Sequence, residues 1–139
     1  MITASRYHDF SAGHRVFNHG SKCADLHGHN YRIHFECQAP TLDDIGRVID
    51  FGEIKSKLCM WLETNWDHKF LIFEDDPWAD PLKQMNPSGV VITSFNPTAE
   101  NMGLHLLNVV APGQLIESSV KLVKVTVEET RKCSASVYL

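Results

Sequence analysis

The 139-residue chain has no long hydrophobic run. No segment approaches the ~20 consecutive apolar residues that a membrane-spanning helix requires. The N-terminal stretch MITASRYHDF also lacks the apolar centre of a secretory signal. We therefore expect a cytoplasmic protein without a membrane partner.

An excess of positive charge is also absent. The chain has 13 Lys and Arg residues against 17 Asp and Glu residues, which gives a formal net charge of -4 at pH 7. Proteins that bind nucleic acids or membrane surfaces present basic patches to phosphates, so this balance argues against both classes of partner. An anionic substrate would have to be attracted by a few local basic groups or by a metal ion.

Cysteine is scarce, and no C-x-x-C pair is present among the four residues Cys23, Cys37, Cys59 and Cys133. In a reducing compartment, cysteines scattered in this way are expected to be free thiols. We interpret Cys37, Cys59 and Cys133 as core or near-core thiols. Cys23 differs because two histidines follow it closely.

The chain is expected to form a single domain over residues 1–139, because it has 43% apolar residues, no internal repeat and no linker. Alternating apolar and polar residues predict strands over residues 2–14 and 29–38. The period of two places His14 on the apolar face of the first strand. The apolar face of the second strand is expected to carry Tyr31, Ile33, Phe35 and Cys37.

Two helices are expected. The first begins at Asp50, which forms the pattern of a capping box with Glu53 three residues later. The second covers residues 96–113, with Asn96 as its cap, Pro97 in its first turn and Pro112-Gly113 at its end. The expected buried stripes are Ile54, Leu58, Trp61 and Leu62 in the first helix, and Met102, Leu106, Val109 and Val110 in the second.

The remaining segments complete an α+β pattern. Residues 75–89 (DDPWADPLKQMNPSG) are expected to form a surface loop, and residues 90–95 (VVITSF) a short strand. The tail over 119–139 alternates strongly and predicts two strands joined near Arg131 and Lys132. This element order predicts a mainly antiparallel sheet with helices on one side.

A metal site is indicated by the stretch KCADLHGHNY, in which His27 and His29 flank a glycine. In an extended chain both imidazoles point to the same side, and a return of the chain would bring His14 beside them. Three histidines with an open fourth position are typical of catalytic zinc, although nickel, iron or copper also bind such ligands. The alternative is that His27 and His29 are ordinary loop residues. We interpret the other histidines, His8, His19, His34 and His105, as lying outside this cluster.

Six motifs together resemble the 6-pyruvoyltetrahydropterin synthase superfamily, and within it the 6-carboxytetrahydropterin synthase branch of queuosine biosynthesis. They are FSAGH (10–14), CADLHGHNY (23–31), VIDFGEIK (48–55), DHKFL (67–71), NPTAEN (96–101) and VTVEET (125–130). Each motif alone is weak, but six in the same order make a specific pattern. The sequence departs from it at Gly13, at Trp66 and in the LIFEDD segment after His68.

The resemblance implies a role for each matching residue. Zinc is expected on His14, His27 and His29, and the catalytic groups are expected to be Cys23 and the pair Asp67 and His68. Glu129 would anchor a pterin, because one carboxylate can accept two adjacent N–H groups of the heterocycle. Without the resemblance, Asp67 would be interpreted as a turn residue and His68 as exposed.

The resemblance also implies a fold and an assembly. The fold would be the T-fold, an antiparallel sheet with two helices on one face, which oligomerises into a β-barrel. The expected partner is therefore a second copy of the chain, in a trimer or in a homohexamer built as a dimer of trimers. Such association would cover the exposed edges of a small sheet.

The spacing between Cys23 and His27, with three residues between them, resembles the carboxy-forming branch. The implied reaction converts 7,8-dihydroneopterin triphosphate to 6-carboxy-5,6,7,8-tetrahydropterin, acetaldehyde and triphosphate. The alternatives are a 6-pyruvoyltetrahydropterin synthase or related pterin side-chain lyase, and a zinc-binding protein without catalysis. Candidate cations for the triphosphate are Arg15, Lys22, Arg131 and Lys132, although each is interpreted first as a solvated surface charge.

Overall fold

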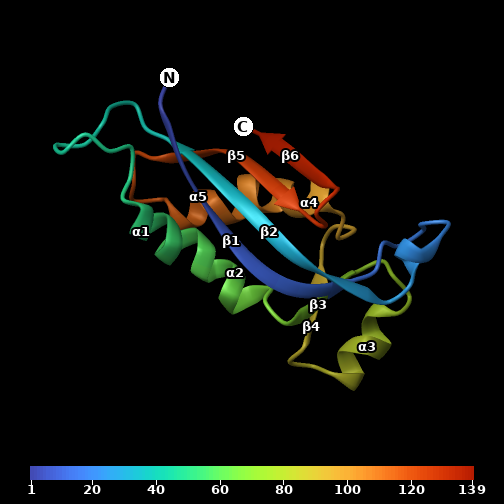
Figure 1. Ribbon diagram of the computed structural model, residues 1–139. Coiled ribbons are helices and arrows are strands. Elements are labelled where there is room, and N and C mark those ends of the chain that lie inside the picture. The colour runs from blue at the N-terminus through green and yellow to red at the C-terminus, as the bar shows by residue number, and fades with distance from the viewer.

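Two long antiparallel strands form the centre of the fold, β1 (Thr3–His14) and β2 (His27–Gln38). The computed structural model describes residues 1–139, and Figure 1 shows these two strands crossing the molecule side by side. Their register pairs Thr3 with Gln38 at one end and His14 with His27 at the other. The two predicted strands are therefore confirmed, and the second begins two residues earlier than expected.

The sheet has six strands in the order β4-β3-β1-β2-β5-β6. On one side of the central pair, β5 (Lys121–Glu128) and β6 (Ser134–Tyr138) continue the antiparallel pattern. On the other side, β3 (Lys69–Phe73) and β4 (Val90–Thr93) run parallel to β1 and to each other. The sheet is therefore mainly antiparallel, as predicted, with parallel pairings only at β3 and β4.

Two elements were not expected from the sequence. Strand β3 is a short apolar run, KFLIF, without the alternation that marks a half-exposed strand. Helix α3 (Ala79–Met85) lies inside the segment that was expected to be a loop. It begins after Asp76, whose carboxylate accepts a hydrogen bond from the Trp78 N–H at 2.9 Å. The proline at position 81 lies in the first turn of this helix, where a missing N–H costs little.

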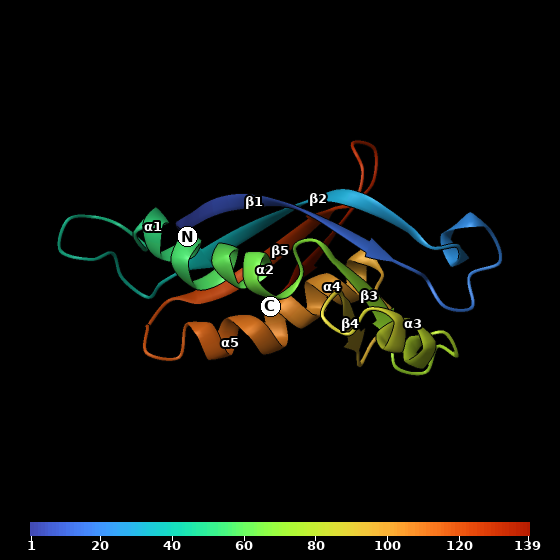
Figure 2. The ribbon, with the colours of Figure 1, turned by 90° about the horizontal axis from the view of Figure 1, so that it is seen from below.

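Two longer helical segments cover one face of the sheet (Figure 2). The first contains α1 (Phe51–Ile54), a π-helical turn over Lys55–Cys59, and α2 (Met60–Asn65). The second contains α4 (Ala99–His105), a π-helical turn over Leu106–Val110, and α5 (Ala111–Gln114). A single 3-10 turn, Lys22–Ala24, lies in the connection between β1 and β2. None of the helices combines the length and the apolar character needed to cross a membrane.

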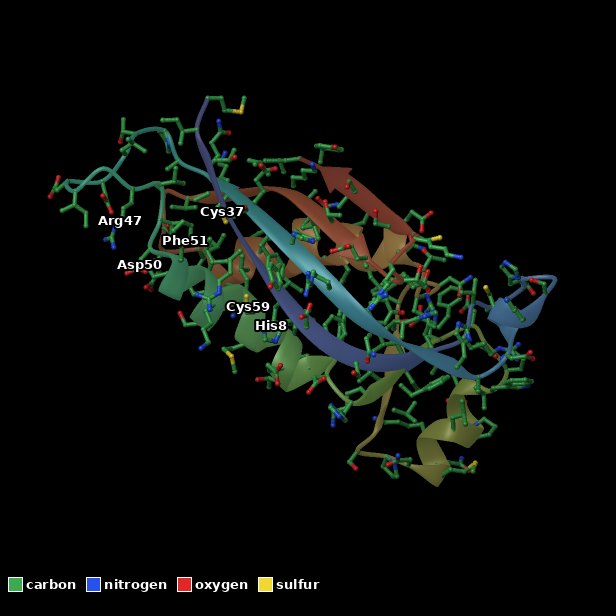
Figure 3. All side chains as sticks on the ribbon, in the orientation of Figure 1. His8, Cys37, Arg47, Asp50, Phe51 and Cys59 are labelled. Atoms are coloured by element: carbon green, nitrogen blue, oxygen red, sulfur yellow. The ribbon has the colours of Figure 1, made fainter.

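The helix caps differ partly from the prediction. Asp50 caps α1 by accepting a hydrogen bond from the Gly52 N–H at 2.8 Å, and Figure 3 shows it at the start of that helix beside Arg47. Glu53 pairs with Lys57 at 3.5 Å and does not complete a capping box. Thr98, and not Asn96, caps α4, because its hydroxyl accepts from the Asn101 N–H at 3.1 Å.

The second helical segment ends later than expected. It continues past Pro112 and Gly113 to Gln114. Pro112 lies in the first turn of α5, directly after the π-helical turn, where a proline is tolerated.

The core lies between the sheet and these helices. The predicted apolar face of β2 is confirmed, since Tyr31, Ile33, Phe35 and Cys37 are all buried. The predicted helix stripes are buried with two exceptions. Trp61 is half-buried, and Val109 is 61% exposed while Leu107 takes its place in the core. Val109 lies in the π-helical turn, which shifts the phase of the helix relative to an α-helical pattern.

The C-terminal strands follow the prediction with one shift. Leu122, Val125 and Val127 of β5 are buried, whereas Val123 is not, because the pairing with β2 shifts by one residue between Glu36 and Cys37. The thiols of Cys37 and Cys59 are in the core, and burial raises the pKa of Cys37 to about 12. Cys133 is exposed in the turn between β5 and β6, so the near-core interpretation of this residue was wrong.

Truncation of a buried helix residue should destabilise this core. Leu62 is fully buried, so Leu62→Ala is expected to lower the free energy of unfolding by about 2–5 kcal/mol. Leu42 is 44% exposed, and Leu42→Ala should change it by about 0.5 kcal/mol or less. Urea unfolding followed by circular dichroism measures both. Equal effects of the two substitutions would contradict this description of the core.

Candidate metal centre and catalytic groups

The register of β1 and β2 brings three histidines together at one end of the sheet. His14 is paired with His27, and His29 lies two residues further along β2, opposite Ala12. Because alternate residues of a strand share a face, His27 and His29 point to the same side. The pair Gly13 and Gly28 lies between these positions, with no side chains to separate the strands.

The imidazoles of the triad converge closely enough to share one ion. One ligand nitrogen from each of His14, His27 and His29 lies within 4.8 Å of the others. The Nε2 atoms of His14 and His27 are 3.1 Å apart. His14 is completely buried, and the other two are half-buried. The three residues selected from the sequence are therefore brought together by the fold.

The other ring nitrogens determine which tautomer each histidine adopts. Nδ1 of His14 donates to the Pro97 carbonyl at 2.7 Å, and Nδ1 of His27 donates to the Asp25 carbonyl at 2.7 Å. With the proton on Nδ1, the Nε2 atom carries a lone pair that is available to a metal. Backbone carbonyls that orient histidines in this way are a common feature of metal sites.

Glu129 lies against the triad. Its Oε1 atom is 3.1 Å from Nε2 of His14 and 3.0 Å from Nε2 of His29. Proximity to the His14 imidazole outweighs partial burial and lowers the pKa of Glu129, so the carboxylate is ionised at neutral pH. Burial lowers the pKa of His29, which favours its neutral form.

These contacts test whether the residues fit a metal ion. The Nε2 atom of His29 is buried and makes no hydrogen bond of acceptable geometry, although the Glu129 carboxylate is near. Lone-pair nitrogens gathered around one point, next to an anionic oxygen, repel one another unless a cation lies between them. The donor set of three imidazoles therefore fits a zinc-type ion.

Asp67 and His68 form a pair at the end of the first helical segment. Asp67 Oδ2 accepts from Nδ1 of His68 at 2.9 Å, and Oδ1 accepts from the Ser11 N–H at 3.1 Å. Burial raises the pKa of Asp67, but the hydrogen bonds from Ser11 and His68 outweigh it, so the net shift is downward. The imidazole of His68 therefore has an ionised partner that fixes its orientation.

His68 has an unusual backbone and an exposed side chain. Its φ angle is 59°, in the left-handed region that few non-glycine residues adopt, and its N–H donates to the Ser11 carbonyl at 2.7 Å. The side chain is 82% exposed. The ring of His68 is thus accessible from outside the chain.

A hollow of about 940 Å³ connects the two groups of residues. Its lining includes His29, Asp67, His68 and Glu129, together with Arg131 from the turn between β5 and β6. Cys23 is not part of this lining. It lies half-buried in the 3-10 turn after β1, where its carbonyl accepts from the Val16 N–H at 2.9 Å. The triad and the lining of this hollow together include six of the seven predicted site residues, and Cys23 is the one outside these two sets.

Several contacts near the site were not evident from the sequence. Arg15, a candidate for phosphate binding, instead pairs with the buried Asp76 at 2.8 Å and stacks on Trp78 at 3.4 Å. Glu128 pairs with His34. The Pro97 carbonyl has no sequence signal of its own, but it lies within the NPTAEN motif, which marked this segment.

A second histidine–carboxylate pair, between His8 and Glu63, was also not predicted from the sequence. Nε2 of His8 bonds the Glu63 carboxylate at 2.6 Å. The charge of His8 also contributes to lowering the pKa of Asp67. His8 and Glu63 are 55 positions apart, so no local pattern could have predicted the contact.

Comparison with known proteins shows that the sequence matches one protein family over nearly its whole length. The sequence profile described as 6-pyruvoyl tetrahydropterin synthase matches residues 3–138. The 6-carboxy-5,6,7,8-tetrahydropterin synthase of Rickettsia typhi is 35% identical over 99% of this chain and 100% of its own length. The protein of the same name from Aquifex aeolicus is 30% identical over 91% of each chain.

Solved structures support the same fold. An uncharacterized protein, WS1659 from Wolinella succinogenes, has a TM-score of 0.83 at 23% identity, over 99% of this chain and 97% of that one. The 6-pyruvoyl tetrahydropterin synthase of Caenorhabditis elegans has a TM-score of 0.67 at 23% identity, over 99% of this chain and 95% of that one. At this level of identity the two structures establish similarity of fold alone.

The glycine between the two histidines should be intolerant of a side chain. A Cβ atom at Gly28 would lie 2.9 Å from the Ala12 carbonyl oxygen, which is backbone and cannot move aside cheaply. Gly28→Ala is expected to destabilise the fold by about 1–3 kcal/mol through overpacking. Gly20→Ala, where a Cβ would meet nothing within 4 Å, is the matched control and should be close to neutral. Thermal unfolding of both variants measures this, and a wild-type melting temperature for Gly28→Ala would contradict it.

Proposed function

The chain belongs to the 6-pyruvoyl tetrahydropterin synthase family, and from this membership we propose that it is a 6-carboxy-5,6,7,8-tetrahydropterin-forming lyase. Its substrate would be 7,8-dihydroneopterin triphosphate, and its other products acetaldehyde and triphosphate, as in queuosine biosynthesis. Support comes from four Rickettsia relatives of that name, each 33–35% identical over their full length. The short spacing between Cys23 and His27 agrees with the same branch.

We assign the three histidines to zinc. The convergence of one ring nitrogen from each of the three histidines, two of which have Nδ1 bound to a backbone carbonyl, is the single observation that carries the proposal. When bound, zinc would polarise the hydroxyl oxygens of the substrate side chain and lower the barrier to removing protons from the adjacent carbons. His14, His27 and His29 would hold it with three neutral ligands, which leaves room for substrate oxygen.

Proton transfer is assigned to Cys23 and His68. A cysteine accepts a proton only as thiolate, and its ordinary pKa of about 8.5 falls near a cation. His68 can hold or pass a proton at Nε2, because Asp67 binds Nδ1 at 2.9 Å and stabilises the protonated ring. The overall conversion consumes one water, whose oxygen balances the substrate against the carboxylate, acetaldehyde and triphosphate products.

The pterin ring is assigned to Glu129. The carboxylate is ionised, and it lies at the end of the apolar row formed by Val125 and Val127. Contacts with the histidines use Oε1. An anionic carboxylate can accept two adjacent N–H groups of a pterin, and such charge-assisted hydrogen bonds are stronger than neutral ones.

We further propose that the active site is completed between subunits. Strand β1 pairs with β3 only at residues 12–14, and Ser11 is bonded by Asp67 and His68, so no strand pairs with the edge over residues 3–10 or with the outer edge of β6. Pairing of these two edges in neighbouring copies would close a barrel, as a trimer or a dimer of trimers. The exposure of His68 agrees with a site that combines groups from more than one chain.

Product analysis tests the reaction. Zinc-loaded protein incubated with 7,8-dihydroneopterin triphosphate should release acetaldehyde and triphosphate, and mass spectrometry should detect 6-carboxy-5,6,7,8-tetrahydropterin. Removal of the metal with a chelator should abolish turnover, and zinc should restore it. A product that retains the three-carbon side chain would indicate the 6-pyruvoyl-forming reaction instead. Absence of any turnover by the zinc-loaded protein would refute both.

Replacement of the proposed thiol should separate chemistry from binding. Cys23→Ala is expected to lower kcat by about 100-fold or more, because a general acid–base group contributes 10²–10⁴-fold. The zinc content and the KM should change little, since neither depends on the sulfur. Cys133→Ser is the control, because Cys133 is exposed in a turn and should leave kcat unchanged. A Cys23→Ala variant with wild-type kcat would remove this residue from the mechanism.

A further inference from the structure

The orientation of His14 depends on a residue far away in the sequence. Its Nδ1 atom donates to the Pro97 carbonyl at 2.7 Å, across a separation of 83 residues. His27 uses the carbonyl of Asp25, two residues before it. Because His14 is completely buried, water cannot replace the partner on Nδ1. The Tyr31 hydroxyl also lies 3.2 Å from Nδ1, but a hydroxyl can donate or accept, whereas the nearer Pro97 carbonyl can only accept. The Pro97 carbonyl is therefore the partner that requires a proton on Nδ1, and its position depends on whatever holds Pro97 in place.

Asn96, directly before Pro97, is held by a closed pair of hydrogen bonds. Its Oδ1 atom accepts from the Phe17 N–H at 2.9 Å, and its Nδ2 atom donates to the Phe17 carbonyl at 2.9 Å. Phe17 follows His14 by three residues, just beyond the end of β1. The side-chain amide of Asn96 thus joins the start of α4 to the end of the strand that carries His14.

The Asn96 backbone carbonyl is engaged as well. It accepts from the Thr98 N–H at 2.8 Å and from Nδ2 of Asn101 at 3.0 Å. The peptide carrying the Pro97 carbonyl therefore lies between an anchored residue and the first turn of α4. Thr98 supplies the helix cap, so Asn96 is not needed for that purpose.

We propose that Asn96 is a positioning residue of the metal centre. By bonding both polar groups of Phe17, it holds the Pro97 carbonyl against Nδ1 of His14 and thereby keeps Nε2 unprotonated and directed at the other two histidines. Asn96 is not itself a ligand. The inference rests on the proposed function, because it requires that the triad bind a metal ion.

The test compares Asn96→Ala with Thr98→Ala in the full chain. Thr98→Ala removes the cap of the same helix but leaves the bonds to Phe17 and to His14 in place, so it controls for loss of helix stability. Zinc affinity is measured by competition with a chromogenic chelator. Asn96→Ala should bind zinc about 10–100-fold more weakly, as expected for loss of an outer-shell partner, and Thr98→Ala should bind it as the wild type does.

Two spectroscopic measurements separate positioning from general destabilisation. In the metal-free protein, long-range ¹H–¹⁵N correlation should place the His14 proton on Nδ1 in wild type and in Thr98→Ala, and on a mixture of nitrogens in Asn96→Ala. In the Co²⁺-loaded protein, the visible absorption bands should shift in Asn96→Ala alone. Unchanged affinity, tautomer and spectrum in Asn96→Ala would overturn the proposal.

Asn96→Asp is the second variant, in case Asn96→Ala does not fold. It retains the acceptor for the Phe17 N–H and loses the donor to the Phe17 carbonyl. Weaker zinc binding by this variant supports the proposal, and wild-type affinity overturns it. His14→Ala tests separately whether the three histidines bind a metal ion at all, which the role of Asn96 requires. If wild type and His14→Ala take up the same amount of metal, the proposed metal site is wrong, whatever the Asn96 variants do.

Discussion

The antiparallel ladder between β1 and β2 is the constraint on which the rest of the molecule depends. It pairs His14 with His27 at one end of the ladder, and His29 lies two residues further along β2. Side chains alternate across a strand, so a slip of one residue would move the imidazoles to opposite faces and expose the apolar row of β2. The burial of Tyr31, Ile33 and Phe35 therefore stabilises the fold and also fixes the register of the site.

Acidic and basic groups near the site are organised as local pairs. Asp67 is bound to His68, Glu129 lies against the triad, and Arg15 is neutralised by Asp76 inside the protein. Such pairing keeps charged groups in fixed positions despite partial burial, because each has a partner to compensate for lost hydration. The overall charge of -4 is thus less informative about substrate binding than the placement of individual charges.

The sequence predicted the parts of the fold that follow a simple period. The alternation of β2 and the placement of the three histidines could be derived because they depend on the period of two along a strand and on one chain reversal. Strand β3 could not, since a short buried run lacks that period, and Val109 was misassigned because a π-helical turn changes the phase. The hydrogen bond from His14 to Pro97 spans 83 residues and is a property of tertiary packing alone. The roles of Cys23, Asp67 and Glu129 came from motif resemblance, because spacing gives no signal for groups that lie so far apart in the chain.

Both helical segments contain a five-residue π-helical turn, over Lys55–Cys59 in one and Leu106–Val110 in the other. A π-helical turn corresponds to one extra residue accommodated in an α-helix, so the residues after it are rotated by about 100° about the axis. Leu62 and Ala111, which follow these turns in the two segments, are both buried. Deletion of one residue from either turn would rotate the helical residues that follow by about 100° and carry a side chain such as Ala111 away from the core. The number of residues in each turn therefore matters for packing as well as the identity of its side chains.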